Sequence, residues 1–278
     1  MKNHSITIGL GNTVHRKRVL MKLTVTALLF LIIAFSGFLI GDEQIEANMS
    51  EKNLSPSVEH LFGTDWLGRD MFYRTFLGLH LSLQVGLLAA TISTLIALIF
   101  SLLSSINKFF DAIVTGLIDL FLSIPHLVAL ILIAFVLGGG VKGVVVGIAL
   151  THWPSLTRVL RAELMQIKSA EYVQISKKLG KSRMWIIRRH FLPQLIPQLF
   201  VGFILLFPHA ILHESAVTFL GFGLSPEQPA IGIILSESMK YLTTGMWWLV
   251  LFPGLSLISM VVMFDVLGNN LRKLLNPN

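Results

Sequence analysis

The apolar residues of this chain fall in long blocks rather than in short periodic stripes. Six of the blocks approach or exceed the roughly 18–20 residues that an α-helix needs to cross the apolar core of a bilayer. They begin near residues 23, 77, 112, 141, 193 and 246. We find no alternating segments of about ten residues, which are the pattern of a membrane β-barrel. The pattern therefore predicts an all-α, polytopic membrane protein with six transmembrane helices.

The blocks divide the chain into membrane-spanning and extramembrane segments. The first block follows a basic stretch, as in a signal peptide, but its apolar core is long and no small-x-small cleavage site precedes Gly41. We therefore expect the first block to be retained as the first span. The expected segments are a cytoplasmic N-terminal segment 1–22, a first transmembrane helix 23–40, an extracytoplasmic loop 41–76, a core 77–268 of five transmembrane helices with a cytoplasmic loop 157–192, and a cytoplasmic tail 269–278.

Composition and charge support a membrane protein and set its orientation. Only 13% of the residues are charged, whereas a soluble domain carries about 25%. If the N-terminus is cytoplasmic, 17 of the 22 Lys and Arg residues fall in cytoplasmic segments. The positive-inside rule then predicts a multi-pass protein of the cell membrane with both termini cytoplasmic. This distribution also explains the net charge of +7 without a nucleic-acid partner, since no nucleic-acid-binding motif accompanies it.

The longest cytoplasmic loop has the pattern of two short helices joined by a glycine. Residues 171–179 suit a helix, and Gly180 stands where a C-terminal cap is expected, after two lysines that complement the helix dipole. Ser182 can begin a second helix, and Pro193 ends that helix or opens the fifth span. We therefore expect a helix–glycine–helix elbow between the fourth and fifth spans.

This elbow resembles the EAA loop of ATP-binding-cassette importer permeases. In that family a Gly follows a Glu-Ala-Ala triplet, and a Leu-Pro pair comes later. This chain departs from the triplet, because Gln-Ile-Ser takes its place. The resemblance implies a loop that couples ATPase subunits to the spans, and it would involve Glu171, Tyr172, Gln174, Ile175, Ser176, Gly180, Leu192 and Pro193. The alternative is a basic helix that lies on anionic headgroups.

Two further motifs narrow the resemblance to the dipeptide/oligopeptide/nickel permease subfamily. Residues 62–70 look like its Gly-Thr-Asp-x-x-Gly-Arg-Asp stretch, which also lies between the first two spans. Residues 214–223 look like its Glu-x-x-x-x-Phe-Leu-Gly-x-Gly stretch, and the whole resemblance covers most of residues 18–277. The outer-loop motif consists of Gly63, Thr64, Asp65, Gly68, Arg69 and Asp70.

The resemblance implies the type I importer permease fold and a set of partners. The chain would pair with a second permease as a heterodimer, bind two ATPase subunits and an extracytoplasmic solute-binding protein, and contact membrane lipid. It has no Gly-x-x-x-x-Gly-Lys-Ser/Thr loop, so ATP and Mg would be bound by the ATPase subunits and no cofactor by this chain. It shows neither HExxH nor GxSxG, so we do not expect an enzyme. A secondary transporter is a distant alternative, because we find no internal repeat.

The outer-loop motif allows two interpretations. Asp65, Arg69 and Asp70 can pair among themselves, and the two glycines can form turns. The motif could form a structured outer loop near the docking site of the solute-binding protein or an outer gate. It could equally be a self-capping loop that only starts the second span.

Ionisable residues inside spans are costly and mark a possible solute path. The candidate path residues are His126, His209, His213 and Glu214. His209 and His213 are four residues apart on the fifth span, so they share a helix face. Glu214 is turned away, and a role in structure or gating is favoured for it over contact with the solute. His126 follows Pro125, which is expected to kink the third span. Imidazole suits nickel, copper, zinc and cobalt, so the favoured solute is a metal held in a small chelate. The histidines would contact this complex weakly as it passes, and we expect no tightly bound metal. The alternatives are di- or oligopeptides, free nickel, and histidines that only bond neighbouring helices.

Overall fold

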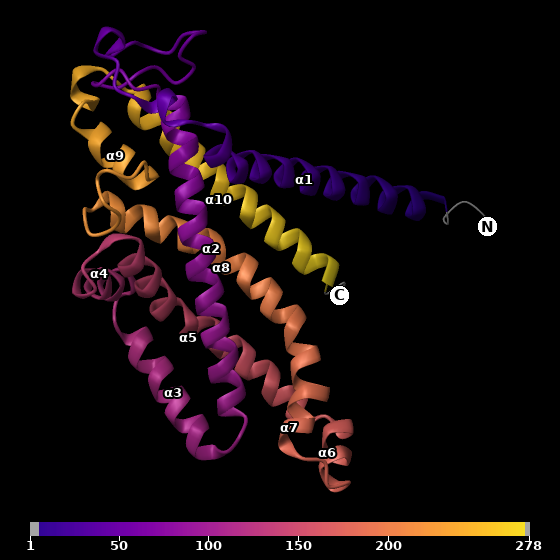
Figure 1. Ribbon diagram of the computed structural model, residues 1–278. Helices are drawn as coiled ribbons and strands as arrows, with labels where there is room; N and C mark the ends of the chain where they lie inside the picture. Colours follow the sequence, from indigo (N-terminus) through magenta and orange to yellow (C-terminus); the bar gives the residue numbers. More distant parts are fainter. Residues whose placement is uncertain (1–5, 276–278) are drawn as a thin grey trace.

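Figure 1 shows the computed structural model, which describes residues 6–275. Residues 1–5 and 276–278, the ends of the predicted cytoplasmic segments, lie outside the described residues. Within this range the chain forms helices and connecting turns and no strand. The elements are α1 (Ile6–Leu39), η1 (Asp42–Ile45), η2 (Met49–Glu51), α2 (Met71–Ser104), α3 (Lys108–Ser123), α4 (His126–Val136), α5 (Gly140–Ser169), α6 (Glu171–Lys178), α7 (Arg183–Ile186), the π turn η3 (Ile187–Phe191), α8 (Leu192–Phe219), α9 (Ile231–Met239), η4 (Leu242–Thr244) and α10 (Trp248–Leu275).

The prediction of an all-α membrane protein is confirmed, and the number of spans stays a prediction. Three helical stretches are long and apolar enough to cross a membrane, namely Met71–Ser104, Arg183–Phe219 and Trp248–Asn270, and α3 with α4 would make a fourth. The apolar part of α1 is shorter, Thr24–Leu39. Helix α5 carries basic residues throughout its second half.

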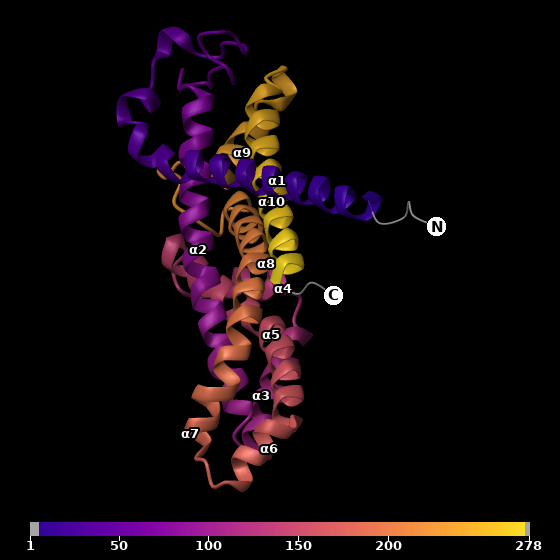
Figure 2. The ribbon, with the colours of Figure 1, turned by 90° about the vertical axis from the view of Figure 1, so that its right-hand side faces the viewer.

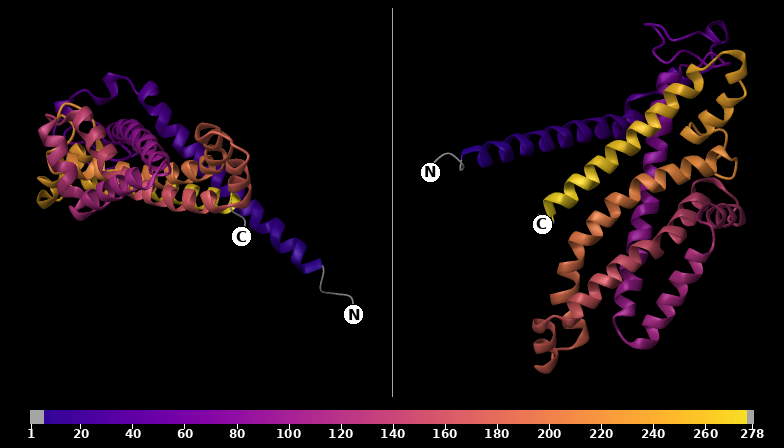
Figure 3. Two further views of the ribbon diagram at one scale, coloured as in Figure 1. Left: turned by 90° about the horizontal axis from the view of Figure 1, so that it is seen from below. Right: turned by 180° about the vertical axis from the view of Figure 1, so that it is seen from behind.

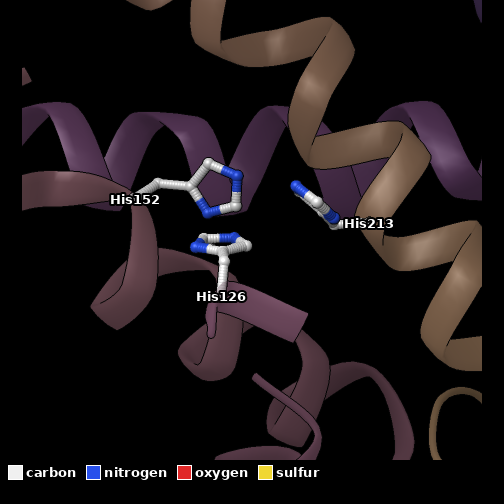
Figure 4. Close-up of side chains that lie close together, drawn as sticks. All are labelled: His126, His152 and His213. Atoms are coloured by element: carbon white, nitrogen blue, oxygen red, sulfur yellow. The ribbon is translucent and has the colours of Figure 1, made fainter. Parts of the chain in front are cut away.

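The predicted kink at Pro125 is a break. Helices α3 and α4 are bent by 95° to one another. Ile124, between them, has an extended backbone (φ −91°, ψ 135°), because the residue before a proline avoids the helical region. Helix α4 therefore lies across the bundle, and its first residue, His126, points back toward α5 and α8 (Figures 1 and 4).

Helix α2 forms the centre of the bundle, and α5, α8, α1 and α10 pack around it (Figure 2). Glycines allow close approach: a Cβ on Gly86 of α2 would lie 2.7 Å from Ile211 of α8. The segment before α2 and the segment around α9 share one end of the molecule, and α6 and α7 form the opposite end (Figures 1 and 3). We call these the outer cap and the elbow, in keeping with the predicted topology.

Candidate functional site

A cavity of about 480 Å³ lies between α5 and α8. Residues spaced three or four apart on each helix line it, so that each helix presents one face. The lining holds apolar side chains, a few hydroxyl and amide groups and four histidines, and it includes no carboxylate among the described residues. The lining residues are His126, Thr151, His152, Ser155, Leu156, Val159, Gln198, Val201, Gly202, Leu205, Leu206, His209 and His213.

Three of these histidines meet at one end of the cavity. His126 comes from the start of α4, His152 from the middle of α5 and His213 from α8 (Figure 4). One ring nitrogen from each lies within 4.8 Å of the others. The ring centroids are 4.4 Å apart for His126 and His152, 4.5 Å for His126 and His213, and 5.1 Å for His152 and His213. We call this group the histidine cluster.

Hydrogen bonds to the backbone orient part of the cluster. The Nδ1 atom of His152 donates to the carbonyl oxygen of Ile148, one turn earlier, at 2.9 Å. His152 is only 9% exposed, so this bond holds a nearly buried ring in place. The Nε2 atom of His126 lies 3.5 Å from Oγ1 of Thr151. The remaining nitrogens of the cluster are available to a ligand in the cavity.

The sequence analysis identified part of this site and missed His152. His209 and His213 line the same cavity, as their spacing predicts, although His209 is exposed and lies outside the cluster. His152 could have been found, because a histidine inside a predicted span is itself unusual. The roles of these residues in a solute path stay predictions.

Glu214 faces away from the cavity, as the helix geometry predicts. Its side chain is fully buried and accepts hydrogen bonds from Ser215 at 3.2 Å and from Thr218 at 3.0 Å. The hydroxyl of Thr218 in turn accepts from the backbone N–H of Leu224 at 3.3 Å. Glu214 therefore ties the end of α8 to the loop that follows, which agrees with a structural role.

The outer-loop motif is organised around Asp65, which is 0% exposed. One carboxylate oxygen accepts from Nε of Arg69 at 2.7 Å and from Nη1 of Arg74 at 2.6 Å. The other accepts from the backbone N–H groups of Leu67 and Arg69. Arg74 also bonds Glu237 of α9 at 3.1 Å. The predicted pair of Asp65 and Arg69 is confirmed, and the sequence analysis missed Arg74 and Glu237.

Asp70 does not join that pair. It caps the start of α2 by accepting from the N–H of Phe72 at 2.7 Å, and its other oxygen accepts from Nδ1 of His60 at 2.8 Å. Gly63 and Gly68 have positive φ angles of 70° and 76°, as expected for turns. The ring of Trp66 stacks on that of Tyr241 at 4.5 Å, so the motif and the loop after α9 form one packed outer cap.

The elbow has the predicted form. Gly180 follows α6 with a φ of 73°, and the side chain of Ser182 accepts from the N–H of Trp185 at the start of α7. Pro193 lies in the first turn of α8, but the helical stretch runs on from Arg183 through η3 to Phe219, so Pro193 neither ends one helix nor opens another as predicted. The π turn η3 directly before Pro193 changes the hydrogen-bond pattern where a proline would interrupt an α-helix. The hydroxyl of Tyr172 accepts from Nε2 of Gln194 at 2.6 Å and braces α6 against α8. Large apolar side chains of the elbow are exposed, namely Ile175, Leu179 and Met184.

Two ion pairs join α3 to the second half of α5. Arg161 makes a two-pronged contact with Asp111, at 2.6 Å and 2.8 Å. This bond to a carboxylate raises the pKa of the Arg161 guanidinium above its ordinary range. Asp119 pairs with Arg158 at 3.3 Å, on the exposed surface.

Comparisons with known proteins agree with one another. The family described as binding-protein-dependent transport system inner membrane component matches residues 89–277. Dipeptide transport system permease protein DppC of Bacillus subtilis (strain 168) is 33% identical over 94% of this chain and 82% of its own length. DppC of Alkalihalophilus pseudofirmus is 32% identical over 94% and 86%. A putative peptide transport system permease protein of Brucella suis biovar 1 is 31% identical over 80% and 75%.

Solved structures show a similar fold. A chain of the MetNI methionine ABC transporter, in an inward-facing conformation, matches with a TM-score of 0.61 and 17% identity, over 74% of this chain and 98% of that chain. A chain of an amino acid ABC transporter matches with a TM-score of 0.55 and 18% identity, over 70% and 91%. At these identities the likeness is one of fold.

Proposed function

We propose, from the premise that this chain belongs to the family of binding-protein-dependent transport system inner membrane components, that it forms half of the path of an importer for short peptides. The chain is a permease of an ATP-binding-cassette importer, and ATP is hydrolysed by separate subunits. The observation that supports a peptide solute is the 33% identity to a dipeptide permease over almost the whole chain. The comparisons therefore favour the peptide alternative over the metal chelate that the sequence analysis placed first.

The two ends of the molecule suit different partners. The cavity lies between α5 and α8 of this one chain, and we propose that a second permease completes the path as a heterodimer. The packed outer cap would face the solute-binding protein. The exposed apolar side chains of the elbow would enter a groove in one of two ATPase subunits, which bind ATP and Mg. The apolar outer surfaces of α2 and α10 would contact lipid.

Uptake of labelled dipeptides tests the solute. A host that lacks peptide importers would receive the complete importer, with or without this chain, and would be supplied with radiolabelled dialanine. We expect ATP-dependent uptake only when the chain is present. Uptake that follows a proton gradient and ignores ATP would favour a secondary transporter, and no peptide uptake at all would defeat the peptide assignment.

Reporter fusions test the proposed topology of six spans with both termini in the cytoplasm. Fusions at residues 55 and 230 should report the outside, and those at 107 and 175 the inside. A fusion at residue 140 is the sharpest, because it lies beyond the break between α3 and α4. An outside signal there would mean that the bent pair crosses the membrane, and an inside signal would make it a re-entrant loop.

Substitution of Gly180 tests the proposed coupling role of the elbow. Gly180→Val places a β-branched residue at a φ of 73°, at a cost of about 1–3 kcal/mol in local strain, although no atom lies within 4 Å of the new Cβ. Transport should fall while the protein still inserts and assembles. Gly180→Asn is the matched control, since asparagine tolerates this conformation. Normal transport by an assembled Gly180→Val importer would remove the elbow from coupling.

A second candidate solute is a metal, either nickel or a metal held by an opine-type chelator. The specific observation in its favour is the histidine cluster, which lies in the wall of the proposed path. Peptides and metal complexes are not exclusive classes, because a short peptide can itself chelate a metal ion through its amine and carboxylate groups.

A further inference from the structure

We infer that His126, His152 and His213 form a binding site for one divalent transition-metal ion, which arrives in complex with a small anionic chelator. The inference deepens the proposed function, because it rests on the cavity between α5 and α8 being a solute path. Imidazole nitrogens are the ligands that nickel, copper, zinc and cobalt share. The site is built by three helices. The sequence predicted two of its histidines, His126 and His213, as candidate path residues, and missed His152.

The distances suit a shared ion. A metal about 2.0–2.1 Å from each nitrogen requires the nitrogens to be about 3.4 Å apart in a tetrahedral arrangement. The nitrogens of the cluster lie within 4.8 Å of one another without an ion. Rotation of the side chains can close this difference, because His126 and His213 are only half-buried and border the cavity.

The hydrogen bond of His152 has the form found at metal centres. A ligating histidine usually donates its other ring N–H to a backbone carbonyl or carboxylate, which fixes the ring and its tautomer. The Nδ1 atom of His152 donates to the carbonyl of Ile148, so Nε2 keeps its lone pair for a ligand. This partner lies in the same helix, so the orientation does not depend on the rest of the cluster.

A purely structural role explains the cluster less well. Buried polar groups in helix bundles normally bond a neighbouring helix. Within residues 6–275, the three rings contact one another face to edge or tilted, and no hydrogen bond joins one ring to another. Because the three imidazoles are in contact without hydrogen bonds to one another, they keep ring nitrogens that can coordinate an ion.

The charge of the cavity selects a complex rather than a free ion. Three neutral imidazoles leave the two positive charges of the metal uncompensated, and the cavity lining contributes no carboxylate. Uncompensated charge at membrane depth is costly. A chelator that supplies carboxylate or deprotonated amide groups would neutralise the ion and fill the coordination positions that three histidines leave open. A short peptide has this chemistry.

Metal binding to the assembled importer tests the site directly. The complex, purified with a tag free of histidine, would be equilibrated with Co²⁺ or Ni²⁺ in the presence of dialanine, and bound metal would be measured by mass spectrometry and by the visible absorption of Co²⁺. We expect one ion per chain. His152→Gln should weaken binding at least tenfold, and the triple variant His126→Gln/His152→Gln/His213→Gln should bind none.

His209→Gln is the matched control, because His209 lines the same cavity outside the cluster and its removal should leave one ion bound. Elution of each variant complex as an assembled particle excludes loss of folding. Equal binding by the triple variant and the unsubstituted complex would overturn the site. Binding that is equally tight without dialanine would overturn the role of the anionic chelator. Uptake of metal-free dialanine by the unsubstituted importer tests the proposed function separately, and its failure would leave the binding result intact.

Discussion

The outer cap and the histidine cluster gather polar side chains in opposite ways. In the outer cap, buried Asp65 receives four hydrogen bonds, two of them from arginine side chains, and Arg74 also pairs with Glu237. In the histidine cluster, the rings meet at the end of a cavity and only His152 is bonded at short range to the backbone. A closed network, in which the polar groups bond one another, is suited to stabilising the fold. An open network, in which polar groups keep unused bonding positions beside a cavity, is suited to receiving a ligand.

Removal of Asp65 should have the largest effect on stability. Asp65→Ala leaves Arg69 and Arg74 with Glu237, which is 30% exposed, as their one shared carboxylate among the described residues. Breaking a buried ion pair costs about 3–5 kcal/mol. We expect a large drop in the midpoint of thermal unfolding in detergent, with loss of assembled importer. A midpoint close to that of the unsubstituted protein would contradict the role of Asp65 as the centre of the outer cap.

Thr218→Val tests the hydrogen-bond network around Glu214, for which we expect an intermediate effect on stability. The substitution keeps the shape of the side chain and removes the hydroxyl that links Glu214 to the N–H of Leu224. A buried carboxylate then loses one of its donors, at a cost of about 1–3 kcal/mol. Thermal unfolding should shift less than for Asp65→Ala, and Thr218→Ser, which keeps the hydroxyl, should restore most of the loss.

Asp119→Asn should have a small effect, although it also breaks an ion pair. The side chains of Arg158 and Asp119 are 60% and 64% exposed, so solvent and salt screen their attraction, and such pairs contribute about 0–1 kcal/mol. The shift should shrink further at high salt. A shift in the unfolding midpoint as large as that of Asp65→Ala would show that solvent exposure does not explain the difference in strength between this ion pair and the buried pairs of Asp65.

The smallest effect on stability is expected in the histidine cluster. His213→Leu replaces a half-buried imidazole that has no protein hydrogen bond to lose by an apolar side chain of similar size, so unfolding should change by about 0.5 kcal/mol or less. Loss of metal binding without loss of stability would sharpen the contrast between the two regions. A loss comparable with Asp65→Ala would mean that the cluster, too, is a closed network.

Local signals in the sequence predicted the helical turn of the elbow at Gly180 and Ser182. These two residues act on their immediate neighbours, so their effects can be read without knowing the fold, whereas the predicted boundary at Pro193 was wrong because the helix continues through it. The pair of Asp65 and Arg69 was predictable for the same reason, since four residues separate them. The break at Pro125 was predicted as a kink, because the residue pattern does not tell how far the chain turns once hydrogen bonding is interrupted.

Contacts between distant segments could not be predicted. Arg74 and Glu237 are 163 residues apart and meet only because α2 and α9 share the outer cap. The histidine cluster needs the turn of α4 across the bundle, which brings His126 to His152 and His213. Asp70 was expected to join the arginine, but capping of α2 holds its carboxylate next to His60 instead.

The π turn at Ile187–Phe191 lies between the elbow and the part of α8 that lines the cavity. Compared with an α-helix, a π turn carries an extra residue, so it behaves as a single-residue insertion that the helix has absorbed. Each residue of an α-helix advances the direction of the side chains by about 100°. Deletion of one residue from this turn would therefore restore α-helical bonding and leave the elbow facing nearly the same way, whereas a one-residue deletion in the α-helical part of α8 would turn the elbow by about 100°. The π turn thus lets the chain carry an extra residue between the elbow and the cavity without changing the direction in which the elbow faces.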